Sequence, residues 1–67
     1  MISFHEIEKL CTKAADLTKT TSNNVSIDLQ IKGYISYIEV GGIKKHTGVH
    51  KPTINESLNS LIQNILP

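Results

Sequence analysis

Residues 25–32 read VSIDLQIK, and an apolar residue stands at every second position of this stretch. Val25, Ile27, Leu29 and Ile31 alternate with Ser26, Asp28, Gln30 and Lys32. Successive side chains of a strand point to opposite faces, so the pattern predicts a strand with one side in a core and the other in water. The flanking segments change to a helical period, which predicts a group of strands between two helices.

Two turns divide the centre of the chain into three strands. Lys32-Gly33 predicts a two-residue turn with Gly33 at positive φ, and Gly41-Gly42 predicts a second one. We expect strands at about residues 25–32, 34–40 and 43–49. The first turn would pair Ile31 with Tyr34, so that the apolar residues of the strands share one face. The second turn would set Glu39 opposite Lys44, an ion pair across the strands.

Both ends of the chain have the pattern of an amphipathic helix. Ser3 and Glu6 have capping-box spacing at the start of a helix expected over residues 3–19, and Thr53 and Glu56 have it at the start of a helix over residues 53–66. The first apolar stripe consists of Phe4, Ile7, Leu10, Cys11, Ala14, Leu17 and Thr18; the second consists of Ile54, Leu58, Leu61, Ile62, Ile65 and Leu66.

Two helices with one apolar face each, and a single sheet to bury them on, predict an α+β fold in the order α-β-β-β-α. In it a three-stranded antiparallel meander carries both helices on one face. The 67 residues then form one small domain. A core of this size rarely supplies more than about 3–5 kcal/mol, which favours support from a protein partner or from a second copy in a homodimer.

The sheet face turned away from the helices is the candidate functional surface. It would carry Ser26, Asp28, Gln30, Ile35, Tyr37, Glu39, Lys44, His46, Gly48 and His50. Ile35 and Tyr37 are apolar or aromatic where a solvated face needs neither, and tyrosine is enriched in protein interfaces. Ordinary surface apolarity is the competing interpretation. The predicted partner-binding residues are Ile35, Tyr37, Glu39, Lys44, Lys45, His46 and His50.

The charged residues allow a second interpretation, in which the chain binds nucleic acid. Lys44, Lys45, His46, His50 and Lys51 would form a basic tip near the second hairpin. The net charge is only +1 and the chain has no arginine, which is the residue best suited to bidentate phosphate and guanine recognition. We therefore rank this interpretation second.

Neither a metal site, a cofactor nor catalysis is expected. His46 and His50 would share a strand face at about 13 Å from each other, too far for one ion. Cys11 lies in an apolar stripe, where a free cysteine behaves as a small hydrophobe. No group of acid, base and nucleophile can be assembled from the sequence, so we expect a protein that is not an enzyme.

The chain has no apolar run long enough for a membrane span, no leader pattern and one cysteine, so we expect a cytoplasmic protein that does not contact membranes. By size and layout it resembles various small proteins of phages and mobile elements, among them anti-CRISPR inhibitors that block host complexes. That resemblance implies a regulatory or inhibitory role exerted through protein binding.

Overall fold

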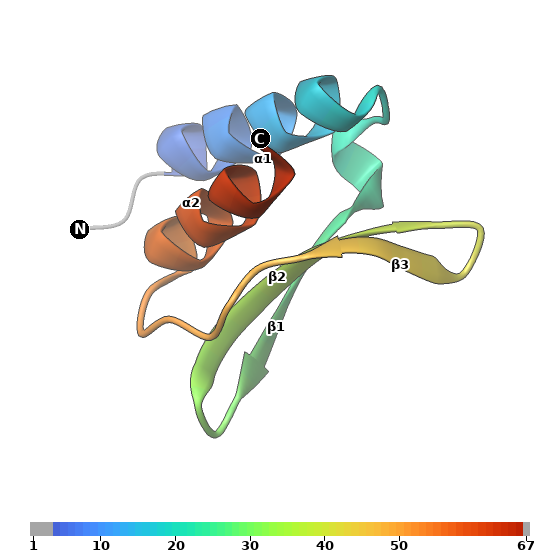
Figure 1. Ribbon diagram of the computed structural model, residues 1–67. Coiled ribbons are helices and arrows are strands. Elements are labelled where there is room, and N and C mark those ends of the chain that lie inside the picture. Colours follow the sequence, from blue (N-terminus) through green and yellow to red (C-terminus); the bar gives the residue numbers. More distant parts are fainter. Residues whose placement is uncertain (1–3, 67) are drawn as a thin grey trace.

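A computed structural model describes residues 4–66, and in this part of the chain two α-helices and a three-stranded antiparallel sheet follow one another in the order α-β-β-β-α (Figure 1). The elements are α1 (Phe4–Thr18), a short 3-10 turn η1 (Ser22–Asn24), β1 (Val25–Gln30), β2 (Gly33–Val40), β3 (Ile43–Thr47) and α2 (Ile54–Ile65). The predicted fold class is confirmed. Ser3, the first residue of the predicted capping box, lies outside the described residues.

Both helices lie on the same side of the sheet, side by side and running in the same direction (Figure 1). α2 packs on β2 and β3, whereas α1 packs mainly on α2 and reaches the sheet at β1. At the start of the two helices, Asn55 Nδ2 donates a hydrogen bond to Glu6 Oε2 over 3.1 Å. The opposite face of the sheet is left without a helix among residues 4–66.

The core is small and centres on α2. Its fully or almost fully buried apolar residues are Ala14, Ala15, Ile38, Leu58, Leu61 and Ile62. Ser36 and Ser57 are buried beside them, and Ser57 Oγ donates to Ser36 Oγ, which in turn donates to the Ser57 carbonyl oxygen at 2.8 Å. These bonds offset the cost of burying two hydroxyl groups. Small side chains at this point let α2 approach the sheet closely.

Several residues that the apolar pattern assigned to the core are exposed, and Phe4, Leu29 and Ile31 are the most exposed of them. Phe4 is 82% exposed, because it stands at the opposite end of α1 from the buried Ala14 and Ala15. Leu29 is 71% exposed and Ile31 fully exposed, because the β1–β2 hairpin extends beyond both helices (Figure 1). The period of a pattern gives the face of a residue but not how far the covering element reaches.

The β1–β2 turn differs from the predicted one by one residue. Ile31 and Lys32 form the turn, and Gln30 pairs with Gly33, so Leu29 rather than Ile31 stands opposite Tyr34. Gly33 has a φ of 113° and is the first residue of β2. The segment after β3 explains this position, because the Lys51 carbonyl oxygen accepts from the Tyr34 N–H at 2.7 Å and crowds the Gly33 Cα. The pairing of β1 with β2 is thus shifted by two residues, an even number, so the faces of both strands are as predicted.

The β2–β3 hairpin turns at Gly41-Gly42, as predicted, and Glu39 stands opposite Lys44. A bulge then shifts the register, so that Ile38 pairs with His46 and Tyr37 with Thr47. The prediction that His46 and Gly48 lie on the outer face is therefore wrong. An extra residue in one strand reverses the side of the residues that directly follow it in that strand. β3 ends at Thr47, two residues earlier than expected.

The helix ends are fixed by local hydrogen bonds. The α1 C-terminus forms a Schellman motif, in which the Thr20 N–H donates to Ala15 O at 2.9 Å and the Lys19 N–H to Asp16 O at 3.3 Å. Lys19 has a φ of 59° and is the only non-glycine residue with positive φ between residues 4 and 66. At the start of α2, Thr53 Oγ1 accepts from the Glu56 N–H at 3.2 Å, as its capping position predicts.

Candidate protein-interaction surface

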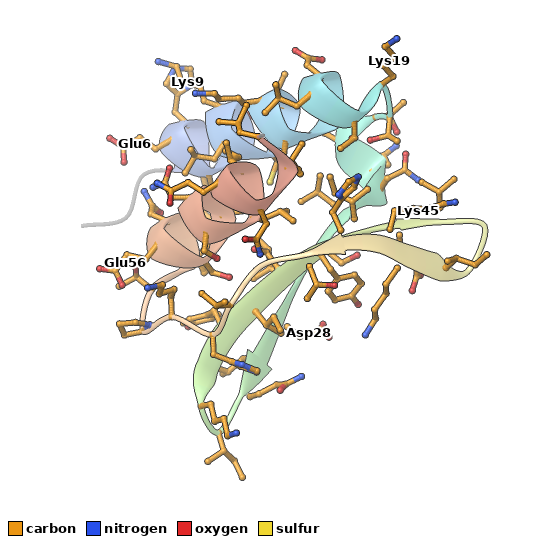
Figure 2. All side chains as sticks on the ribbon, viewed as in Figure 1. Glu6, Lys9, Lys19, Asp28, Lys45 and Glu56 are labelled. Carbon is orange, nitrogen blue, oxygen red and sulfur yellow. The ribbon has the colours of Figure 1, made fainter. Side chains whose placement is uncertain are left out.

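The side of the sheet opposite the helices is called the open face here. The strand register places on it Ser26, Asp28 and Gln30 of β1, Ile35, Tyr37 and Glu39 of β2, and Lys44 and Thr47 of β3. β2 is the central strand, so its three residues form the middle row. Figure 2 shows Asp28 on this side of the sheet and Lys45 on the helix side.

Ile35 and Tyr37 form the apolar centre of the open face. Ile35 stands opposite Asp28, and Tyr37 lies between Ser26 on β1 and Thr47 on β3. Both side chains are half-buried by these neighbours and keep part of their surface exposed. The centre is thus a short apolar ridge surrounded by groups that can donate or accept hydrogen bonds.

Lys44 covers one end of this ridge. Its ammonium nitrogen lies 4.4 Å from the centroid of the Tyr37 ring, a distance at which the cation is attracted by the negative ring face. Glu39 stands opposite Lys44 across the strands. The Glu39 carbonyl oxygen also accepts from Asn24 Nδ2 at 3.1 Å, which ties this end of β2 to η1. The contact with Lys44 limits the orientations available to the Tyr37 ring.

His50 closes the other end of the open face. Its Nε2 lies 2.9 Å from Gln30 Oε1, across the side-chain-free Gly33 that pairs with Gln30. The antiparallel bridge between Tyr34 and Lys51 holds the segment in place. Lys44 and His50 therefore stand at opposite ends of the face and are not part of one basic cluster.

Five of the seven predicted site residues are brought together on the open face: Ile35, Tyr37, Glu39, Lys44 and His50. His46 is half-buried on the helix side opposite Ile38, and Lys45 is the additional residue at the bulge, beside His46, Thr18 and Thr20. Thr47 was missed in the sequence analysis. No residue type near position 45 marks a bulge, so the sequence carries no signal that would have found it.

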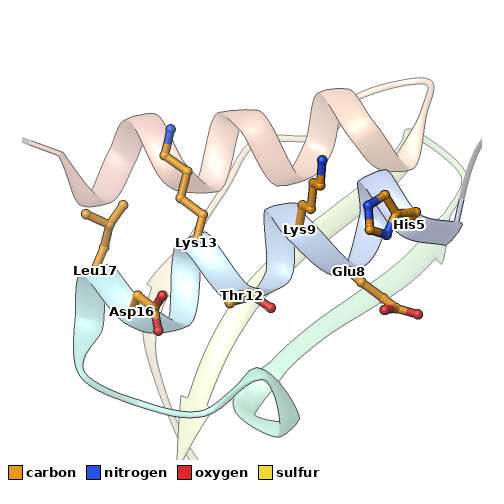
Figure 3. A pocket seen from close by; sticks show the side chains of 7 residues that line it. All are labelled: His5, Glu8, Lys9, Thr12, Lys13, Asp16 and Leu17. Atoms are coloured by element: carbon orange, nitrogen blue, oxygen red, sulfur yellow. The ribbon is translucent and has the colours of Figure 1, made fainter.

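A shallow hollow runs along α1, lined by His5, Glu8, Lys9, Thr12, Lys13, Asp16 and Leu17 (Figure 3). All of these residues belong to one helix and face outward from it. A ligand site needs walls from several elements to exclude water. This hollow is therefore space between the side chains of a convex surface.

Cys11 is a half-buried free cysteine of α1, and its surroundings do not activate its thiol. Burial raises the pKa of the Cys11 thiol above its usual value, and the charge of Glu8 raises it further, which lowers the thiolate fraction at neutral pH. Within residues 4–66, no group of three histidine, cysteine, aspartate or glutamate side chains is arranged to hold a metal ion.

Comparison of the chain with family models, with curated proteins and with solved structures finds no match. No helix in the described part of the chain is both long and apolar enough to cross a membrane.

Proposed function

We propose that this protein is a non-enzymatic interaction module that binds a partner protein through the open face. The observation that carries the proposal is the half-exposed pair Ile35 and Tyr37 at the centre of a sheet whose other face holds both helices. Modulation or steric inhibition of a partner complex is the form of activity that suits a domain of 67 residues. It is also the form that the resemblance to small phage and mobile-element inhibitors implies.

The chemistry of the open face supports a protein as the ligand. Tyrosine combines a large contact area with a polar tip, and apolar anchors surrounded by polar groups are the usual anatomy of an interface. Lys44 restricts the Tyr37 ring before binding, which reduces the entropy lost on association. The complementary surface would offer an apolar centre to Ile35 and Tyr37, a basic group to Asp28 and an acidic group to Lys44.

The test uses a photoreactive phenylalanine analogue at position 37, which should crosslink to one protein of the native host with fixed stoichiometry. The same analogue at Gln63, an exposed residue of α2, is the matched control and should give no such product. Ile35→Thr keeps the branched strand residue but removes the apolar anchor. It should weaken the isolated complex by about tenfold or more. Equal crosslinking from both positions, or unchanged affinity of a folded Ile35→Thr variant, would overturn the proposal.

Nucleic-acid binding is the alternative function, and retention of the protein on DNA or RNA tests it. The bulge weakens the case for nucleic-acid binding because it separates the basic residues: Lys44 is on the open face, whereas Lys45 and His46 are on the helix side. Binding through lysines would appear as salt-dependent retention on DNA or RNA. If the double variant Lys44→Glu, Lys45→Glu removed such retention, the nucleic-acid interpretation would replace the protein-binding one.

A further inference from the structure

The two edges of the sheet are built differently. The β3 edge carries Lys44 and Lys45 and a bulge, features by which natural sheets prevent pairing with another chain. The β1 edge has neither lysine nor proline, and β1 pairs with β2 over six consecutive residues without a register shift. The outward-facing N–H and C=O groups of β1 are thus regularly spaced along the edge. Such an edge can pair with a further strand.

The side chains of β1 also leave apolar surface uncovered at this edge. Leu29 points to the helix side of the sheet, but it is 71% exposed because the helices end before the hairpin. Val25, at the other end of β1, is half-buried near η1 and packs against the core. One end of the strand is therefore covered by the chain's own helices and the other end is bare.

We infer that β1 pairs with β1 of a second copy of this chain, antiparallel about a two-fold axis at Ile27, to form a continuous six-stranded sheet. In this register Ile27 faces Ile27 of the second copy, and Leu29 faces Val25 of the second copy. Ser26 faces Asp28 of the second copy, so a hydroxyl donor meets each carboxylate. The pairing uses the same surface on both copies, as a two-fold interface requires.

Neighbouring registers are less favourable. Moving the axis to Asp28 would set two carboxylates directly opposite each other, which is destabilising. Moving it to a point between Ile27 and Asp28 would place apolar residues of one copy beside polar residues of the other. The sequence VSIDL on a regular edge is thus complementary to itself in the register that has Ile27 at its centre.

The antiparallel arrangement also matches the ends of the two copies. It brings the η1 and α1 end of one copy beside the bare Leu29 end of the other, because β1 starts at η1 and finishes at the uncovered hairpin. Burial of both Leu29 side chains would add apolar contacts to a domain whose own core is small. The pairing does not use the open-face anchors Ile35 and Tyr37, so it goes beyond the proposed function and can fail independently of it.

The first experiment measures mass by sedimentation across protein concentrations from about 1 μM to 1 mM. The wild-type chain should change from monomer to dimer, and Leu29→Lys should raise the dissociation constant by about tenfold or more. Ile43→Lys is the matched control: Ile43 is 60% exposed on the β3 edge, and its substitution should leave the dimer unchanged. A wild-type chain that stays monomeric, or equal effects of the two variants, would overturn the inference.

The second experiment tests the register by oxidation of single cysteines in a Cys11→Ser background. Ile27→Cys should form an intermolecular disulfide, because the axis brings the two copies of residue 27 together. Leu29→Cys should not, because its two copies would lie about 13 Å apart along the strands. Preferential crosslinking of Leu29→Cys, or equal crosslinking of both, would overturn the proposed pairing.

Discussion

The turns of the two hairpins in the sheet are fixed by different contacts. In the β1–β2 hairpin, Gly33 lies against another part of the chain: a Cβ there would come within 2.5 Å of the Lys51 carbonyl oxygen. In the β2–β3 hairpin, a Cβ on Gly41 or Gly42 would meet nothing within 4 Å. One hairpin is thus fixed by a tertiary contact and the other by its turn residues alone.

This difference matters for the open face. Gly33 lets the segment around Lys51 return to β2, and this segment holds His50 beside Gln30. The Gly41-Gly42 turn leaves β3 less constrained. In this hairpin Lys44 lies over Tyr37, and the bulge that follows Lys44 moves His46 to the helix side. The two ends of the face therefore depend on different kinds of contact, which substitutions can separate.

The largest effect is expected for Gly33→Ala. The methyl group would overlap the Lys51 carbonyl, and a φ of 113° is strained for any L side chain, so we expect a loss of about 3 kcal/mol or more. Gly42→Ala is the matched control, with a φ of 79° but open space, and should cost about 1 kcal/mol. Urea unfolding measures both. Equal losses would mean that the contact with Lys51 does not fix the first hairpin.

The next effect concerns the chain just after β3, where Gly48 lets α2 approach the sheet. A Cβ there would lie 2.6 Å from Ser60 Oγ and 2.9 Å from the Leu61 nitrogen. The second atom is backbone and cannot move without moving α2, so we expect Gly48→Ala to cost about 2 kcal/mol. Thr47→Ala, at an exposed neighbour, should cost much less in the same unfolding experiment. A neutral Gly48→Ala would show that α2 is free to shift on the sheet.

Lys19 differs from the turn glycines because it adopts a positive φ although it carries a side chain. At this Schellman position a lysine pays a steric cost that glycine avoids, so Lys19→Gly should stabilise the fold by about 0.5–1 kcal/mol. Lys13→Gly, at an exposed site inside α1, should instead destabilise it by about 1 kcal/mol. Thermal melts of the two variants should shift in opposite directions; a shift in the same direction would contradict the left-handed conformation at Lys19.

The same contrast explains what could be predicted from the sequence. The alternation in β1 and the glycine pair at 41–42 are local signals, and they predicted the three strands, the faces of β1 and β2 and the Glu39–Lys44 pairing correctly. The position of Gly33 depends on Lys51, eighteen residues away, and the side of His46 depends on a bulge that no residue type marks. The burial of Ser36 and Ser57 could not be predicted from the sequence either, because it depends on the close approach of α2 to the sheet.

The smallest effect is expected for the contact that orders the open face. Lys44→Met keeps the aliphatic stem but removes the charge above Tyr37, and should cost about 0.5–1 kcal/mol because the contact is exposed. In a Tyr37→Leu background, the same change should cost almost nothing, since no aromatic ring remains, and this cycle isolates the coupling between the two residues. Gln30→Ala, which removes the His50 contact at the other end of the face, should have a similarly small effect on unfolding. An absence of coupling between Lys44 and Tyr37 would mean that the ring is not ordered by the lysine, and that its orientation before partner binding depends on the strand neighbours Ser26 and Thr47.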